Sequence, residues 1–198
     1  MKEVNLDQNI FEDFHWLNEP ENYYFENALV IETEAETDFW QRTHYGFRRD
    51  DGHALLTELE GDFSFKAKFT FEPQNKYDQC GILLRLDSEN WIKISTEYEN
   101  QDISRMGSVV TNYGYSDWAS EDISSEISTI WYKVSKRGSD FLIENSFDGR
   151  EWSQMRVSHL QQDFEKIEAG VYACSPLDSS FNAKIKEIVI DDNHWEKE

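Results

Sequence analysis

The sequence predicts an all-β protein, built as an antiparallel two-sheet sandwich of the jelly-roll type. Ten or more short segments alternate apolar and polar residues and are separated by turn-forming residues, a pattern typical of antiparallel strands. Helical periodicity is limited to residues 160–167, and strands do not alternate with helices, which argues against a parallel sheet. The 198 residues, 38% of them hydrophobic, suffice for one core, so we expect a single domain over residues 1–198.

The first strands follow an aromatic N-terminal segment. Residues 1–27 lack a regular pattern, and we expect them to be irregular and to pack on the sandwich. A strand is predicted over residues 28–33. Residues 63–71 show the clearest alternation in the chain, ending before Pro73, which cannot donate to a sheet ladder. The residues predicted to be buried in this strand are Phe63, Phe65, Ala67, Phe69 and Phe71.

A central hairpin is predicted over residues 79–98. Its apolar side chains fall on one face if Asp87 pairs with Trp91, which leaves a three-residue loop ending at Asn90, a residue that tolerates the left-handed conformation. The opposite face is chemically rich and lies in the middle of the sequence, where a strand is expected to be central in its sheet. That face carries Gln79, Arg85, Trp91, Lys93 and Glu97. We interpret it as a binding surface.

Further strands are predicted towards the C-terminus. Asp148 and Gly149 form a strong hairpin signal between two of them. The predicted segments are residues 107–112, 129–136, 141–147, 169–174 and 181–190.

The net charge of −21 restricts the class of partner. Nucleic acids and anionic membranes are bound through Lys and Arg patches, and no run of basic residues longer than two occurs. Neutral, polyhydroxylated or cationic partners are compatible with this charge. Cys80 and Cys174 lie in apolar strands and are expected to be buried free thiols. With no apolar leader or transmembrane-length segment, we expect a cytoplasmic protein.

Known catalytic and metal-binding patterns are weak or missing. The five histidines are dispersed and no calcium, phosphate-loop or nucleophile motif occurs, so we expect no metal and no cofactor. Glycosidases on jelly-roll sandwiches use two carboxylates about 5–9 Å apart. The best match to their motif, residues 36–41, has Gln41 where the second acid is needed and lies in a polar connection instead of an apolar strand. A pairing of Glu97 with Asp117 in space is the remaining catalytic alternative.

Two segments have the composition of a sugar site. Residues 37–46 and 108–118 combine Trp, Tyr, His, Asn and Asp. Aromatic rings contact the apolar C–H face of a sugar, while amides and carboxylates accept its hydroxyl hydrogens. Ordinary loop packing explains the same composition about equally well.

The chain resembles a concanavalin A-like β-sandwich family that includes the YesU-type proteins and the regulation-of-enolase-protein group. The resemblance covers nearly the whole chain. It is carried by Thr37-Asp-Phe-Trp40 with His44, Gly52-His53, Tyr77-Asp-Gln-Cys-Gly81, Trp91-Ile-Lys93 with Glu97-Tyr98, Ser108-Val-Val-Thr111, Ser116-Asp-Trp118, Ser146-Phe-Asp-Gly149 with Trp152, and Gly170-Val-Tyr172 with Ser175-Pro176.

This resemblance implies a lectin/glucanase-like double sheet with a concave face. It does not imply glycosidase activity, because the glucanase carboxylate motif is missing. The residues that it places on or near the concave face are Trp40, His44, Gln79, Trp91, Lys93, Glu97, Asp117 and Trp118.

Three functions are compatible with these observations. The favoured interpretation is a binding protein for a saccharide or small polyol, with Trp91 and Trp118 as stacking platforms. The second is a regulator of a metabolic enzyme, and the third is a hydrolase or lyase that uses Glu97 with Asp117. Lys93 and Glu97 lie about 13 Å apart along one strand, so each needs a partner from another strand or from a ligand.

Overall fold

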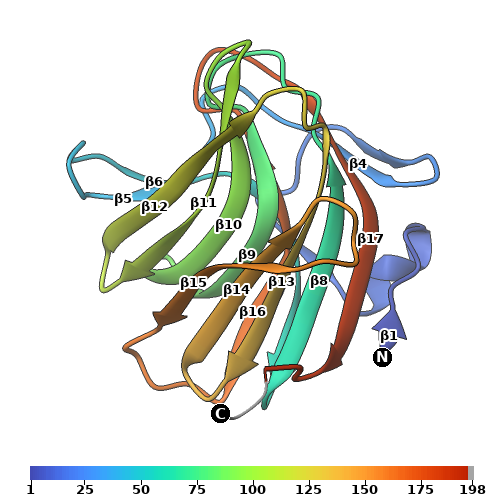
Figure 1. Ribbon diagram of the computed structural model, residues 1–198, viewed down its shortest axis with the longest axis vertical. Helices are drawn as coiled ribbons and strands as arrows, with labels where there is room; N and C mark the ends of the chain where they lie inside the picture. The colour runs from blue at the N-terminus through green and yellow to red at the C-terminus, as the bar shows by residue number, and fades with distance from the viewer. Residues whose placement is uncertain (196–198) are drawn as a thin grey trace.

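The computed structural model describes residues 1–195, and its strands confirm the predicted all-β class (Figure 1). In this part of the chain the strands form two large antiparallel sheets, which we call the back sheet and the front sheet. The back sheet has the order β15 (Ser153–His159), β14 (Asp140–Ser146), β13 (Thr129–Arg137), β8 (Phe63–Thr70), β17 (Asn182–Asp192), β4 (Leu29–Glu32) and β3 (Tyr23–Phe25), with β1 (Lys2–Glu3) also paired to β17. The front sheet has the order β12 (Tyr115–Ser124), β11 (Ile103–Asn112), β10 (Asn90–Tyr98), β9 (Gln79–Asp87), β16 (Lys166–Cys174), β7 (His53–Glu60) and β2 (His15–Leu17).

The main core lies between the two sheets, because alternate residues of each strand point inward. Strand β8 follows the predicted alternation: all five apolar residues from Phe63 to Phe71 are buried in this core. The front sheet contributes Ile82, Leu84 and Ile92 from its central strands. The opposite face of the front sheet is therefore free to form a second surface.

The central hairpin, β9–β10, keeps the predicted faces but not the predicted register. Trp91 lies opposite Arg85 instead of Asp87, and a bulge separates Trp91 from Asn90. The Asp87 carboxylate accepts the backbone N–H of Glu89 and the side-chain amide of Asn90, which tightens the loop. A slip of two residues leaves every side chain on its original face, so the facial assignment is confirmed.

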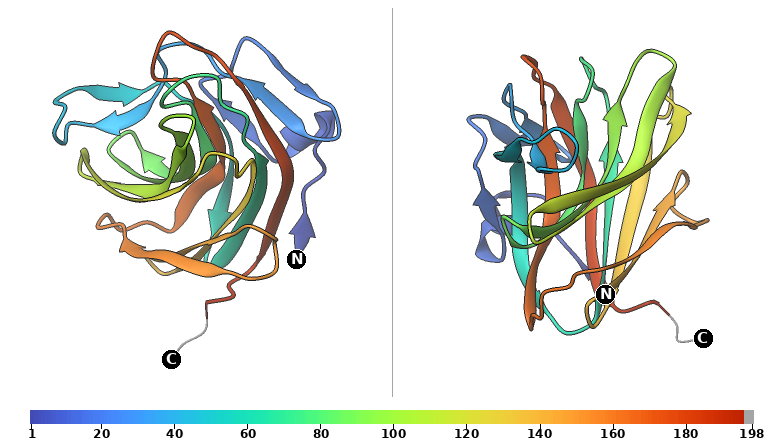
Figure 2. Two further views of the ribbon diagram at one scale, coloured as in Figure 1. Left: turned by 45° about the horizontal axis from the view of Figure 1, so that its top comes forward. Right: turned by 90° about the vertical axis from the view of Figure 1, so that its left-hand side faces the viewer.

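A short separate hairpin consists of β5 (Phe39–Gln41) and β6 (Arg48–Asp50). It projects beside the curved β10–β12 end of the front sheet (Figures 1 and 2). Arg85 donates two hydrogen bonds to the Asp50 carboxylate, at 2.6 and 2.8 Å, and Gln41 N–H donates to Ser116 Oγ at 3.0 Å. These contacts fix the hairpin against the outer face of the front sheet.

Two glycines allow the strands of the front sheet to approach closely on the same face. A Cβ atom at Gly81 would lie 1.8 Å from the carbonyl oxygen of Ile94, and one at Gly170 would lie 1.9 Å from that of Leu55. Only glycine fits where neighbouring backbones come so near. The sheet curls visibly in Figure 2, which makes its outer face concave.

The weak helical periodicity of residues 160–167 does not correspond to a helix in the structure. Leu160 is buried, and Phe164 stacks on Phe141 with ring centroids 6.4 Å apart, while the segment runs without helical hydrogen bonds into β16. The apolar residues of this segment reach the core from an extended connection. Tertiary packing overrides the weak local pattern here.

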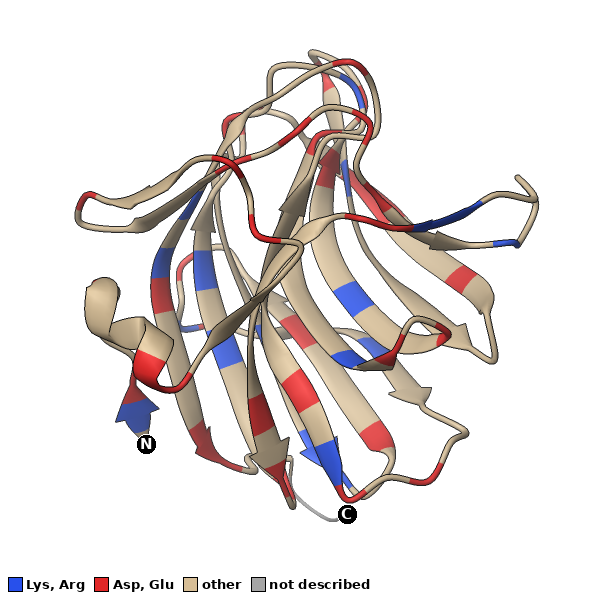
Figure 3. Cartoon of the chain, turned by 180° about the vertical axis from the view of Figure 1, so that it is seen from behind, with Lys and Arg blue, Asp and Glu red and all other residues tan. Residues whose placement is uncertain are grey.

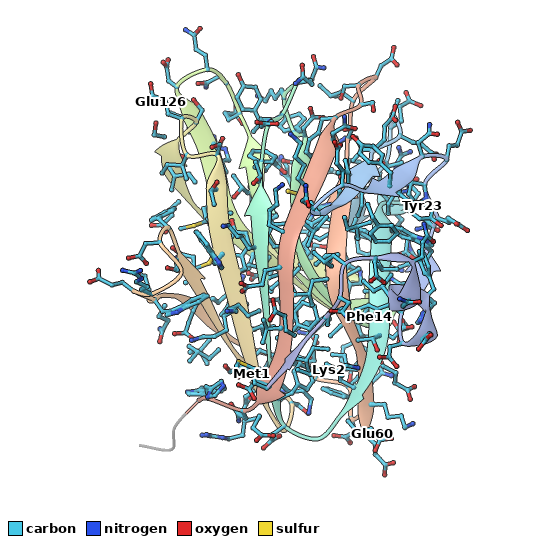
Figure 4. The ribbon with its side chains drawn as sticks, turned by 90° about the vertical axis from the view of Figure 1, so that its right-hand side faces the viewer. Met1, Lys2, Phe14, Tyr23, Glu60 and Glu126 are labelled. Atoms are coloured by element: carbon cyan, nitrogen blue, oxygen red, sulfur yellow. The ribbon has the colours of Figure 1, made fainter. Side chains whose placement is uncertain are left out.

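The N-terminal segment is more regular than expected. A short 3-10 helix, η1 (Gln8–Glu12), joins β1, which pairs with the back sheet, to β2, which pairs with the front sheet. Figure 4 shows this segment, with Phe14 and Tyr23 labelled, lying along one side of the sandwich. Phe14 is buried, and the terminal amine forms an ion pair with Asp191 at 2.6 Å.

Both cysteines, Cys80 and Cys174, are buried free thiols, as predicted. Acidic residues are spread over strands and loops of both sheets, with basic residues interspersed among them (Figure 3), and the whole sequence has 40 acidic against 19 basic residues. Over residues 1–195 the structure contains no helix that is long and apolar enough to cross a membrane.

Candidate functional site

A pocket of about 250 Å³ lies on the concave face of the front sheet, between the sheet and the β5–β6 hairpin. We call it the concave pocket. Its floor comes from β9, β10 and β11, and its walls come from β12, the β5–β6 hairpin and the loops at residues 77 and 176–177. The lining residues are Asp38, Trp40, Tyr45, Phe47, Tyr77, Gln79, Lys93, Ser95, Glu97, Arg105, Gly107, Val109, Trp118, Pro176 and Leu177.

A hydrogen-bonded network forms the floor of the pocket. Lys93 Nζ donates to Gln79 Oε1 at 2.9 Å and to Asp38 Oδ1 at 3.2 Å, while the amide nitrogen of Gln79 donates to Glu97 Oε2 at 3.0 Å. The Tyr172 hydroxyl donates to Gln79 Oε1 at 3.0 Å. Gln79 therefore links Lys93 to Glu97, as expected for two charges too far apart for direct contact.

Burial shifts the pKa values of the ionisable side chains in this floor. Burial raises the pKa of Glu97 to about 7, and the Lys93 ammonium only partly offsets this effect. Burial is the largest single effect on Lys93 and lowers its pKa, but the electrostatic interactions with Asp38, Cys174 and Glu97 and the hydrogen bond to Asp38 together outweigh burial, so the pKa of Lys93 is raised. Burial also raises the pKa of the Cys174 thiol, so this cysteine stays protonated and unreactive at neutral pH.

The walls of the pocket are aromatic. Trp40 packs edge-on against Tyr45 with centroids 5.4 Å apart, and Tyr45 stacks on Phe47 at 5.6 Å. The exposed fractions are 55% for Tyr45, 43% for Phe47 and 40% for Trp118. Large exposed rings around a polar floor give the pocket both stacking surfaces and hydrogen-bonding groups.

Five of the eight residues predicted for the concave face line this pocket: Trp40, Gln79, Lys93, Glu97 and Trp118. They come from four separate strands of the chain. The other three, Trp91, His44 and Asp117, lie elsewhere, each for a different reason.

Trp91 lies on the predicted face but its side chain has no exposed surface. Phe39 of β5 covers it, with ring centroids 6.2 Å apart, and also packs edge-on against Tyr172 at 5.8 Å. The indole N–H is used within the loop, donating to the Ser88 carbonyl at 3.3 Å. Trp91 therefore supports the hairpin from below, and it offers no stacking surface to a ligand.

Asp117 and its neighbour Trp118 point to opposite faces of β12, because successive strand residues alternate. The Asp117 carboxylate pairs with Arg156 of β15 at 2.5 Å, outside the concave pocket. Glu97 and Asp117 thus lie on different faces of the front sheet, so the predicted catalytic pairing of these two acids is wrong. His44 is exposed in the β5–β6 loop, packs against Tyr45, and does not line the pocket.

Asp38 and Arg105 were missed by the sequence reasoning. Asp38 lies within residues 36–41, the segment closest to the glycosidase motif, but the sequence does not indicate that Asp38 pairs with Lys93. Arg105 faces Glu97 from the next strand, as the register of β10 and β11 requires. Tyr45 and Phe47 lie in or beside the aromatic segment from residue 37 to 46, which was the available signal.

The pocket does not have the acid cluster of a metal site. Among residues 1–195 no group of three or more His, Cys, Asp or Glu side chains is placed to hold a metal ion. The arrangement instead suits a small polar molecule with an apolar face.

Comparison with known proteins places this fold in a family. A family profile described as "Protein of unknown function (DUF1349)" matches residues 16–193. Regulation of enolase protein 1 from Saccharomyces cerevisiae is 32% identical over 162 residues, which cover 81% of this chain and 80% of that protein. The crystal structure of a functionally unknown protein from Saccharomyces cerevisiae superposes with a TM-score of 0.85 at 28% identity, covering 91% of this chain and 97% of that one.

More distant structures share the fold alone. The GH43 protein BlXynB from Bacillus licheniformis superposes with a TM-score of 0.71 at 14% identity, covering 91% of this chain and 37% of that protein. An alginate lyase from Klebsiella pneumoniae superposes with a TM-score of 0.62 at 8% identity, covering 87% and 84% of the two chains. Because the family profile spans nearly all of the sandwich and the yeast relative matches over most of its length, this chain belongs to the DUF1349 family.

Proposed function

We propose that the concave pocket binds one saccharide ring or a similar polyol and does not transform it. The observation that carries this proposal is the meeting of exposed aromatic rings with a polar floor of Gln79, Lys93 and Glu97 in one pocket. The volume of 250 Å³ equals that of roughly eight waters of bulk liquid, which suits a single small ring.

The two kinds of surface match the two kinds of surface on a sugar. Trp118 and the Tyr45–Phe47 stack offer apolar faces to the C–H groups. The free oxygen of Glu97 accepts a hydroxyl hydrogen, and the Lys93 ammonium, which has three N–H groups and two acceptors within the network, donates to a hydroxyl oxygen. Hydrogen bonds to such charged groups are stronger than neutral ones.

Binding without chemistry is favoured by the state of the carboxylates. Asp38 is already committed to Lys93 and to its neighbour's backbone N–H, at 3.2 and 2.7 Å. Asp117 lies on the other face of the sheet. Glu97 therefore has no second free acid among the residues that line the pocket, as the usual hydrolysis of a glycoside requires.

A thermal-shift screen against monosaccharides, oligosaccharides, sugar acids and sugar phosphates tests this proposal, because a ligand that binds only the folded state raises the melting temperature. We expect a concentration-dependent shift that Trp118→Ala abolishes and Tyr115→Ala retains. Tyr115 is the matched control: it is an exposed aromatic residue of the same strand that lies outside the pocket. An equal shift in both variants, or no shift with any compound, contradicts the proposal.

A second candidate follows from the yeast relative, whose name describes a protein that regulates enolase. In this alternative the protein is cytoplasmic, consistent with its two free thiols, and the exposed Tyr45 and Phe47 contact a metabolic enzyme. Affinity capture from lysate, with a Tyr45→Ser/Phe47→Ser double variant as control, separates the two. A stoichiometric metabolic enzyme captured by the wild type and lost in the variant supports regulation, and an enzyme retained equally by both contradicts it.

A further inference from the structure

The charged groups of the concave pocket are unevenly paired. On the floor two carboxylates, Asp38 and Glu97, face the single ammonium of Lys93, which bonds to Asp38. Arg105 at the rim is already shared between Glu99 at 3.3 Å and Asp122 at 3.6 Å. The charges of Lys93 and Arg105 both lower the pKa of Glu97, but among the described residues neither cation forms a hydrogen bond or an ion pair with it, so Glu97 is the acid of this pocket that has no directly paired cation.

Glu97 is the group that lacks a partner. One of its oxygens accepts from the neutral amide of Gln79, and within the described residues its other oxygen has neither a hydrogen bond nor an ion pair. A carboxylate shielded from water is costly unless a cation pairs with it. Glu97 lines the pocket and its side chain is half-buried, so a ligand in the pocket can reach this carboxylate.

The walls favour the same kind of ligand. The faces of Trp, Tyr and Phe rings attract cations, and rings surrounding a carboxylate are a recurring site for ammonium groups. Trp40, Tyr45, Phe47 and Trp118 all line the pocket around Glu97. The net charge of −21 adds a favourable long-range field for a cation.

We propose that the preferred ligand of the concave pocket is a polyol that carries a protonated amine, such as an amino sugar, with the amine paired to Glu97. This inference rests on the proposed function and narrows its ligand class. A neutral sugar offers Glu97 only a hydroxyl hydrogen, which satisfies the hydrogen bond but not the charge. An ammonium group in the same position supplies both.

Binding of the amine is coupled to the release of a proton from Glu97. Because the pKa of Glu97 is raised to about 7, much of the free protein carries this acid protonated below that pH, and pairing with an ammonium ion returns its proton to solvent. The charged or titratable groups that face Glu97 are Lys93 of its own strand, Glu99 just past the end of that strand, Arg105 of β11, Asp38, and Tyr172 and Cys174 of β16. Glu97 has a pKa near neutral pH and, among the described residues, no cation paired to it.

Isothermal titration calorimetry with three isosteric pairs, glucosamine with glucose, galactosamine with galactose and mannosamine with mannose, tests the inference. At pH 6.5 we expect at least one amino sugar to bind about tenfold more tightly than its neutral isostere. Titrations in two buffers of different ionisation enthalpy should show proton release with that amino sugar only. Its N-acetylated form, which has the same ring but no charge, should lose the preference.

Two variants assign the preference to Glu97. Glu97→Gln keeps the Gln79 contact and should bring the amino sugar and its isostere to equal affinity without proton release. Glu144→Gln is the matched control: it is the same substitution in a part-buried ion pair, with Lys133 at 2.8 Å on the back sheet, and should leave the preference intact.

The possible outcomes distinguish failure of this inference from failure of the proposed function. Equal binding of neutral and amino sugars to the wild type overturns the inference while the proposed function stands. A preference that survives Glu97→Gln also overturns it. If no sugar of either kind binds, the proposed function fails and the inference falls with it.

Discussion

Glu97 illustrates how position in a strand sets the chemistry of a single side chain. It lies four residues from Lys93 on the same face, yet Lys93 pairs with Asp38 and leaves Glu97 to a neutral amide. Two residues further along the chain, just past the end of β10, Glu99 has Lys76 at 2.6 Å and Arg105 at 3.3 Å. The pKa values of these two neighbouring glutamates are therefore shifted in opposite directions, upward for Glu97 and downward for Glu99.

The first prediction concerns stability against pH at Glu97. Its pKa is about 7 in the folded protein against 4.5 for the free side chain, so the folded state holds the proton more tightly. The contribution of Glu97 to stability is fully present below about pH 4.5 and is lost as pH rises to about 7. We expect Glu97→Gln to raise the free energy of unfolding at pH 8 by on the order of 2 kcal/mol, measured by urea denaturation, and to have little effect at pH 4.5.

Glu99→Gln is the control for this prediction, because hydrogen bonds from Lys76 and Arg105 lower the pKa of Glu99. The contribution of the Glu99 carboxylate to the stability of the folded protein is present at neutral pH and is lost as pH falls through the lowered pKa. The substitution should therefore destabilise the protein at pH 8. If both glutamine variants shift stability in the same direction at pH 8, the burial argument for Glu97 is wrong.

The second prediction concerns the buried ion pair of Lys93 and Asp38. Replacing Lys93 with Met leaves the Asp38 carboxylate without its cation and removes a donor to Gln79. We expect Lys93→Met to lower the free energy of unfolding by about 3 kcal/mol, measured by chemical denaturation at pH 7. Adding Asp38→Asn to Lys93→Met should restore part of the lost free energy of unfolding. If the losses measured for the two single variants simply add in the double variant, the two side chains do not interact.

For individual residues, some positions in the site could be predicted from the sequence and others could not. Alternation along β12 alone implies that Asp117 and Trp118 cannot share a face, so their separation was predictable. The burial of Trp91 was not, because the ring that covers it, Phe39, comes from a segment about fifty residues away. The pairing of Lys93 with Asp38 depends on that same docking.

The elements of the front sheet show how curvature creates a pocket on a surface that would otherwise be flat. Gly81 and Gly170 lie on the concave face, where the carbonyl oxygens of Ile94 and Leu55 occupy the space of a side chain. The sheet curls so that this face is concave (Figure 2), and the β5–β6 hairpin covers one part of the resulting hollow. The uncovered part is the concave pocket.

The third prediction follows from this close approach. A methyl group at Gly81 would require two strands to separate, so Gly81→Ala should lower the free energy of unfolding by about 1–3 kcal/mol. Chemical denaturation measures the change. Gly138→Asn is the control, because Gly138 has open space around it and a left-handed φ of +58° that Asn tolerates. A Gly81→Ala variant as stable as the control would contradict the proposed crowding.

Strands could be predicted from the sequence where apolar and polar residues alternate clearly. The alternation of β8 and of β9–β10 identified their faces because a period of two leaves only two choices. The register of the hairpin was wrong by two residues because it depends on the Asp87 contacts in the loop, which alternation does not encode. The β5–β6 hairpin, only three residues in each strand, was too short to be recognised.

For the whole molecule, the dominant electrostatic feature is its excess of acidic residues, which extends over the strands and loops of both sheets (Figure 3). A net charge of −21 repels itself more strongly in the compact state than in the extended one. The ion pairs on the surface contribute little by comparison. The acidity therefore favours dispersal in solution at a cost in stability.

The fourth prediction follows from this charge. Raising the NaCl concentration from about 0.01 M to about 0.15 M shortens the screening length from about 30 Å to about 8 Å. We expect the melting temperature at pH 8 to rise, as measured by differential scanning calorimetry, because repulsion between acidic residues is reduced. Sodium and lithium chloride should act alike if screening is the cause. A fall in melting temperature would show that specific ion pairs outweigh the general repulsion.

The order of the strands has a consequence for the synthesis of the protein. Strand β17 lies between β8 and β4 in the back sheet, and β16 lies between β9 and β7 in the front sheet. Each sheet is thus held together by a strand from the last thirty or so residues, and β1 has no partner until β17 exists. While the chain is still emerging from the ribosome, its earlier strands have unpaired edges and cannot close either sheet. The earlier strands therefore stay open to aggregation until β16 and β17 are available, and the net charge of −21 opposes association of neighbouring chains by repulsion during that interval.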